Sequence, residues 1–166
     1  MAIFNIGWLG DVDFERIDTS TDGSNITPPR YDVGTILPSS DGGEYMYVKS
    51  TGAVTAGDLV KISSDGNFTI SKGNATTLPS TEPAACGAAQ TAFPTGTSHG
   101  WVKIKGPMNV SVLASCVQDV KLYSTATDGA VDDAGTAVIA GLKLITTIVG
   151  AAVSPCFANN RLAVYP

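Results

Sequence analysis

The segment LVKISSDGNFTI (residues 59–70) decides the fold class of this 166-residue chain, because it holds two short apolar runs around an Asp-Gly turn. The first run is LVKI (residues 59–62) and the second is FTI (residues 68–70). An Asp-Gly pair between two such runs is typical of a β-hairpin. The segment therefore predicts two antiparallel strands.

Short strands and turns continue on both sides of this hairpin. The segment EYMYVK (residues 44–49) carries a tyrosine at every second position, so both tyrosines lie on one face of a strand. In WVKIK (residues 101–105), strict alternation pairs Val102 with Ile104 and points the lysines outward. About nine or ten short strands at such spacing predict an all-β fold, a small barrel or sandwich of short antiparallel strands.

The composition agrees with strands and turns. Only 15% of the residues are charged, 43% are hydrophobic, and there are 18 glycines and 9 prolines, a mixture that favours short strands over helices. The net charge is −5, and no cluster of lysines and arginines is present to neutralise phosphates. We therefore expect no nucleic-acid partner.

One apolar stretch approaches the length of a membrane span. It is AGTAVIAGLKLITTIVGAAV (residues 134–153), and Lys143 lies at its centre. A central lysine opposes insertion, so two core strands joined at Gly141 or Thr146 explain the stretch better than a membrane helix does. We expect no membrane partner, and the start of the chain lacks the pattern of a signal peptide. Three widely spaced cysteines are interpreted as buried free thiols of a reducing compartment, the host cytoplasm: Cys86, Cys116 and Cys156.

The chain divides near Arg30. Residues 1–30 are expected to form an extended N-terminal arm, and residues 31–166 the barrel or sandwich domain. The linker TSTDGSNITPP (residues 19–29) supports this boundary. The arm begins with an apolar patch that we expect to bind a partner or, alternatively, to cover its own barrel; its residues are Ile3, Phe4, Ile6, Trp8 and Leu9.

Residues able to carry chemistry are few. The only histidine, His99, is expected in an exposed loop, and no nucleophile turn lies near it. No cysteine or histidine pair has zinc spacing. One acidic run resembles the opening of a calcium loop but lacks the glycine at the sixth and the glutamate at the twelfth position; it consists of Asp11, Asp13, Glu15 and Asp18. We therefore predict a non-enzymatic protein without catalytic, metal-binding or cofactor-binding residues.

Several segments resemble the small β-barrel decoration (cement) proteins encoded beside the major capsid proteins of tailed bacteriophages. The resemblance covers residues 31–166 in style and rests on residues 43–48, 52–60, 101–106, 122–124, 128–131 and 149–153. It implies a homotrimer on local threefold axes of the capsid, with the major capsid protein as partner and without catalysis or cofactor. It also places the protein in the virion, on the capsid surface.

The expected function is therefore that of a structural virion protein, which binds the outer capsid surface and stabilises the head by bridging major capsid subunits. An alternative is a receptor- or glycan-binding module of a phage head fibre or tail, which would use exposed aromatic residues such as Tyr45, Tyr47 or Trp101. An enzyme built on Cys86 or Cys116 with His99 is a remote third hypothesis.

Overall fold

A computed structural model gives the fold of the chain, and it describes residues 3–6, 10–19, 29–79, 81, 83–95 and 97–164. The all-β prediction is confirmed, since every regular element in these ranges is a strand. The described part contains no helix long and apolar enough to cross a membrane. The strands, in chain order, are β1 (Ile3–Ile6), β2 (Gly10–Asp13), β3 (Asp18–Thr19), β4 (Ile36–Pro38), β5 (Glu44–Ser50), β6 (Leu59–Ile62), β7 (Thr69–Lys72), β8 (Ala84–Ala89), β9 (Ser98–Val112), β10 (Lys121–Ser124), β11 (Ala130–Asp132), β12 (Val138–Leu144) and β13 (Ala152–Val164).

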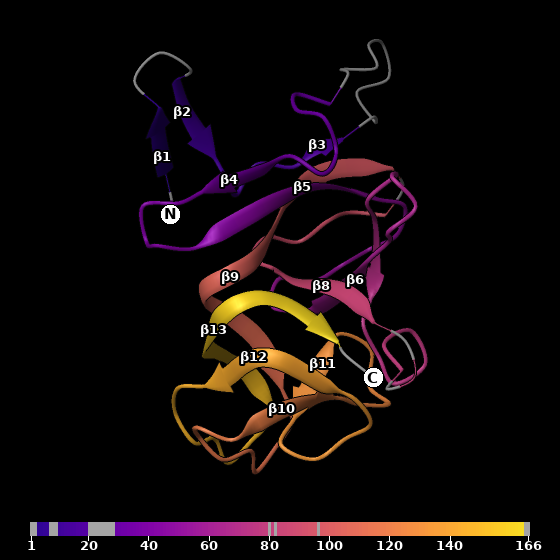
Figure 1. Cartoon of the computed structure of the whole chain (residues 1–166), viewed down its shortest axis with the longest axis vertical. Coiled ribbons are helices and arrows are strands. Elements are labelled where there is room, and N and C mark those ends of the chain that lie inside the picture. The colour runs from indigo at the N-terminus through magenta and orange to yellow at the C-terminus, as the bar shows by residue number, and fades with distance from the viewer. Residues whose placement is uncertain are drawn as a thin grey trace.

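Strand pairing closes two rings that share β9 (Figure 1). In the first ring β5 pairs with β9, β9 with β8, β8 with β6, β6 with β7, and β7 returns to β5. In the second ring β9 pairs with β13, β13 with β12, β12 with β10, β10 with β11, and β11 returns to β9. We call these rings the first and the second barrel.

The two barrels have the same topology. In each, the first strand in chain order pairs in parallel with the third, and every other pair is antiparallel. The 15-residue β9 is the last strand of the first barrel and the first strand of the second. A trace of this repeat survives in the sequence, because Val60-Lys61-Ile62 and Val120-Lys121-Leu122 each precede an Asp-Gly turn. The glycines of these turns have φ values of 82° and 75°.

Each barrel encloses its own apolar core. Alternation along β9 sends Val102 and Ile104 into the first core, as predicted, and Val110 and Val112 into the second. Gly106, with a φ of 90°, lies between these two halves of the strand. One face of β9 therefore supplies both cores, and the barrels form one body.

Several sequence predictions can be compared with this fold. The hairpin of residues 59–70 is confirmed as β6 and β7. The stretch 134–153 holds β12 and the start of β13, which are joined through the loop of residues 145–151, as the two-strand interpretation requires. All three cysteines are free and buried, as predicted.

Two predictions are wrong. Lys103 does not point into solvent but is 2% exposed, because the turn between β4 and β5 folds over it. His99 does not lie in an exposed loop, because it belongs to β9 and is partly buried. In the strand register it lies opposite Asp18 of β3 and Lys49 of β5.

Candidate functional site

An aromatic layer covers the outer face of β5 and β9 in the first barrel. Phe14 stacks on Tyr45 with a centroid separation of 4.3 Å and meets Trp101 edge-on at 5.2 Å. Tyr31 packs edge-on against Trp101 and Tyr47, at 5.0 and 5.4 Å. Tyr45, Tyr47 and Trp101 are all buried, so they do not form the exposed aromatic surface that the glycan-binding alternative would use.

Asp18 fixes this layer electrostatically. Its carboxylate accepts a hydrogen bond of 2.7 Å from the Tyr47 hydroxyl and lies 3.1 Å from Arg16 Nε and 3.7 Å from Arg30 Nε. Burial and this carboxylate raise the pKa of Tyr47. Since Arg16 and Arg30 flank residues 20–28 in the sequence, both ends of the predicted linker lie against the first barrel.

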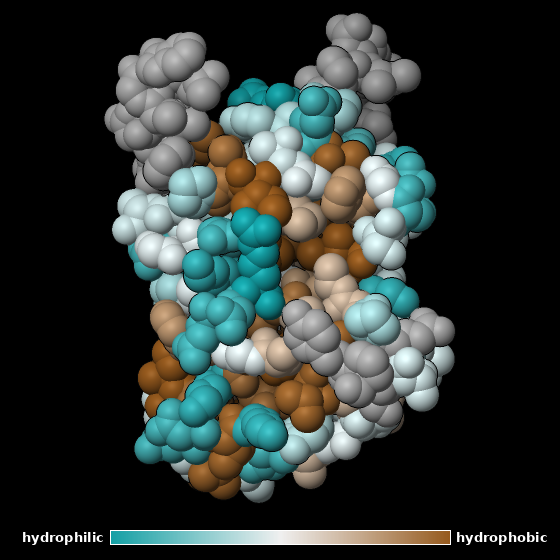
Figure 2. Space-filling view, viewed as in Figure 1, coloured by the Kyte–Doolittle hydropathy of each residue, from teal (hydrophilic) through white to brown (hydrophobic). Residues whose placement is uncertain are grey.

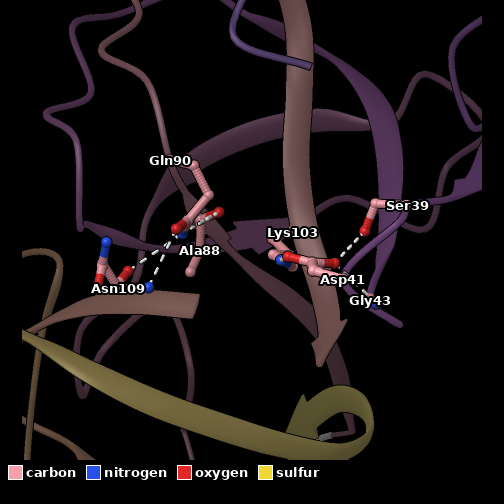
Figure 3. A network of polar contacts seen from close by, with 7 residues as sticks. All are labelled: Ser39, Asp41, Gly43, Ala88, Gln90, Lys103 and Asn109. Carbon is pink, nitrogen blue, oxygen red and sulfur yellow. Dashed lines mark hydrogen bonds and ion pairs between the residues drawn. The ribbon is translucent and has the colours of Figure 1, made fainter. Parts of the chain in front are cut away.

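A polar pocket of about 380 Å³ lies beside this layer, where the two barrels meet. On one wall the Lys103 ammonium donates to Asp41 and lies 5.0 Å from the centre of the Tyr45 ring (Figure 3). Asp41 also accepts hydrogen bonds from the Ser39 hydroxyl and the Gly43 N–H. Burial alone would raise the pKa of Asp41, but these three hydrogen bonds outweigh it and hold the pKa below its usual value.

The opposite wall of the pocket joins the end of β8 to the second half of β9. The Gln90 amide donates to the carbonyl oxygens of Asn109 and Ala88, at 3.1 and 3.3 Å, and accepts from the Asn109 N–H at 3.0 Å (Figure 3). Both walls are thus built from groups that already have partners. Their hydrogen bonds and ion pair hold the β4–β5 turn against the two barrels.

The thiols are not prepared for catalysis. Cys156 lines the pocket, but burial raises its pKa to about 12, and burial does the same for Cys86. Both thiols are therefore protonated at neutral pH and are poor nucleophiles. All three cysteines belong to the second core, whereas His99 stacks on Tyr47 in the aromatic layer. The structure does not bring a cysteine and the histidine together.

One group of possible metal ligands, built around Asp132 and Asp133, was missed by sequence reasoning. Their carboxylates and the Cys116 thiol lie within 4.8 Å of one another. Asp133 is already used in the fold, because it accepts a hydrogen bond of 2.9 Å from the Val117 N–H. Burial, and then the two carboxylates, raise the pKa of Cys116, which favours the neutral thiol. We therefore interpret the cluster as one that stabilises the loop before β10.

The exposed apolar side chains gather on the second barrel. Among the described residues, the exposed large hydrophobic side chains all belong to the loop before β10, the loop before β13 or the outer face of β13: Val117, Val120, Ile145, Val149, Val153 and Phe157. The two loops are hydrogen-bonded to each other, from the Ser115 N–H to the Val149 carbonyl and from the Ile148 N–H to the Cys116 carbonyl. In the view of Figure 2, brown apolar patches divided by polar groups appear over the second barrel and also over the first. We call this set of six residues the apolar face.

The predicted arm residues lie partly outside the described residues. Ile3, Phe4 and Ile6 belong to β1, which forms a two-stranded antiparallel hairpin with β2, whereas Trp8 and Leu9 are not described. The hairpin lies at the end of the molecule opposite the second barrel (Figure 1). Val12 within β2 and Phe14 just after it are 2% and 1% exposed and pack into the aromatic layer.

Neither a protein family model nor a curated protein matches this sequence. The function is therefore argued from the geometry and from the resemblance noted in the sequence.

Proposed function

We propose that this protein is a structural virion protein, which binds the outer surface of a bacteriophage capsid and stabilises the head by bridging major capsid subunits. The observation that carries the proposal is the apolar face, because six large hydrophobic side chains that gather on one barrel indicate a surface covered in an assembly. The first barrel contributes none of them. The protein would therefore bind the capsid through the second barrel.

The arrangement of the body also supports this proposal. Two closed barrels leave few free strand edges, and the shared β9 makes them one stiff unit. The β1–β2 hairpin lies at the far end (Figure 1), where it offers a second place for a neighbour to bind. A unit with contacts at both ends can span two neighbours, and many copies then resist separation of the shell by multivalent binding. The homotrimer and the major capsid protein as partner come from the resemblance described above.

Co-sedimentation with heads that lack the protein tests the proposal. The triple variant Val149→Ser, Val153→Ser, Phe157→Ser should bind at least about tenfold more weakly than the unsubstituted protein, because each substitution removes apolar contact area. A matched control replaces two exposed alanines of the first barrel, Ala53→Ser and Ala56→Ser, and should bind normally.

Thermal unfolding should be nearly unchanged in both variants, since the replaced side chains are exposed. Normal head binding by the triple variant would contradict a docking role for the apolar face. Failure of the unsubstituted protein to bind heads would contradict the proposed function itself.

A further inference from the structure

The matching topology of the two barrels lets positions on one be compared with positions on the other. In each barrel the first and third strands are parallel, and this pairing aligns Lys49 with Thr69 in the first barrel and Ser111 with Ala130 in the second. Lys49 of β5 and Ser111 of β9 are therefore equivalent. It follows that the outer face of the β5–β9 pair, which carries the aromatic layer, corresponds to the outer face of the β9–β13 pair. We call the latter the open face.

One pair of equivalent residues differs in burial in a way that their chemistry does not explain. The antiparallel registers make His99 of β9 equivalent to Val153 of β13. Four residues further along these strands, Lys103 is equivalent to Phe157. Lys103 is 2% exposed although it is charged, whereas Phe157 is 43% exposed although it is apolar. Since the two positions are equivalent, the difference comes from what lies over each face.

The cover of the first face comes from segments that precede β5. Phe14 and Tyr31 both pack edge-on against Trp101. Asp41 of the β4–β5 turn binds Lys103. The second barrel begins with the shared β9, so strands of the first barrel take the place in the chain that such covering segments would have. This arrangement favours a cover that another molecule supplies.

The segment over the first barrel shows what kind of chain fits such a face. Val12 and Phe14 of this segment are buried against the barrel. Asp13 and Glu15, which alternate with them, are exposed. The open face has a matching period, because its exposed apolar residues on β13 are also two positions apart: Val153, Pro155 and Phe157. They span about 14 Å at about 3.4 Å per residue, so an extended chain with the same alternation matches this strip.

The open face is continuous with the face that is already covered. The pocket of about 380 Å³ between the barrels is lined by Glu15 and Tyr45 from the aromatic layer and its covering segment. It is also lined by Pro107 and Pro155 from the open face. A segment laid on the open face would therefore meet the existing cover at Glu15 and extend the layer onto the second barrel.

We propose that an extended segment of a capsid subunit, with apolar side chains at every second position, lies across the open face as residues 12–14 lie across the first barrel. The inference rests on the proposed function, from which it takes the partner, and it names the kind of capsid element that is bound. In the complex Phe157 becomes buried, as its equivalent Lys103 is in the free protein.

Photo-crosslinking on bare heads tests the inference. The full-length protein carries p-benzoylphenylalanine in place of Phe157 or, as the matched control, in place of Ala53, an exposed residue of the first barrel. Crosslinks from position 157, located by mass spectrometry, should map to one continuous stretch of the major capsid protein. Position 53 should give few crosslinks or none.

Synthetic peptides of about ten residues, long enough to span the open face at about 3.4 Å per residue, provide a second measurement. They tile the sequence of the major capsid protein, and fluorescence anisotropy reports their binding to the free protein. The peptide that contains the crosslinked stretch should bind. Phe157→Ser should weaken this binding at least about fivefold, because it removes apolar contact area, whereas Ala53→Ser should leave it unchanged. Alanine substitution along the peptide should weaken binding at every second position.

Crosslinks spread over separate stretches of the capsid protein, or crosslinks to a second copy of this chain, would overturn the inference while head binding leaves the proposed function standing. The same holds if none of the tiled peptides binds, or if the sensitive positions of the bound peptide recur every third or fourth residue, as in a helix. Failure of the unsubstituted protein to bind heads would instead contradict the proposed function, and with it the capsid as the source of the segment.

Discussion

Replacing Phe14 with alanine should lower the free energy of unfolding by about 3–5 kcal/mol. The phenylalanine ring is 1% exposed, stacks on Tyr45 at 4.3 Å and meets Trp101 edge-on. Its removal deletes buried apolar contacts and leaves a cavity between the N-terminal segment and the first barrel. In a chain of this length, each kcal/mol of lost stability lowers the melting temperature by about 2–4 °C, so the melting temperature should fall by roughly 6–20 °C.

Urea unfolding followed by tryptophan emission and by circular dichroism measures this loss. The substitution should also shift the emission of the native state to longer wavelength, since it opens the packing around Trp101. The matched control is Phe157→Ala, which removes the same side chain from a position that is 43% exposed and should cost less than about 1 kcal/mol. A loss below about 1 kcal/mol for Phe14→Ala, with unchanged emission, would refute the packing of the N-terminal segment on the barrel.

Three further predictions concern the body of the protein. Asp41→Asn should lower the free energy of unfolding by about 1–3 kcal/mol, because it leaves a buried ammonium without its charged partner. This loss should exceed that of Lys103→Met, and urea unfolding measures both. Since the folded state lowers the pKa of Asp41, its ionised form stabilises the fold above about pH 4 and this contribution is lost as the pH falls through the folded pKa; unfolding of the Asn variant should depend less on pH in that acid range. Gly106→Ala should cost more than about 1 kcal/mol, because φ is 90° and the new Cβ would lie 2.5 Å from a backbone carbon of Gly43, whereas Gly150→Ala has open space and should be nearly neutral in thermal unfolding. The three cysteines should react with a thiol reagent only as the protein unfolds, and rapid reaction of the native protein would contradict their burial.

Local signals carried much of the fold. The Asp-Gly turn defined the β6–β7 hairpin. Period-two alternation placed Val102 and Ile104 on one face of their strand, and this face is the one buried inside the first barrel. These features depend on neighbours in the sequence, so a single chain reveals them.

Features that depend on distant residues were not predictable. The partner of Lys103 is Asp41, 62 residues earlier, so the alternation of β9 suggested an exposed lysine where the fold buries the lysine beneath a partly exposed carboxylate. The repeat of the two barrels was missed because they share β9, which hides where one unit ends and the next begins. The apolar face was also invisible, since Val117, Val149 and Phe157 come from three separate segments.

Electron cryomicroscopy of bare heads mixed with the purified protein tests the central claim most directly. The account predicts density at fixed positions on the outer shell, with the apolar face of the second barrel buried against neighbouring subunits. Heads that stay bare at saturating protein, or bound copies whose apolar face points into solvent, would contradict it.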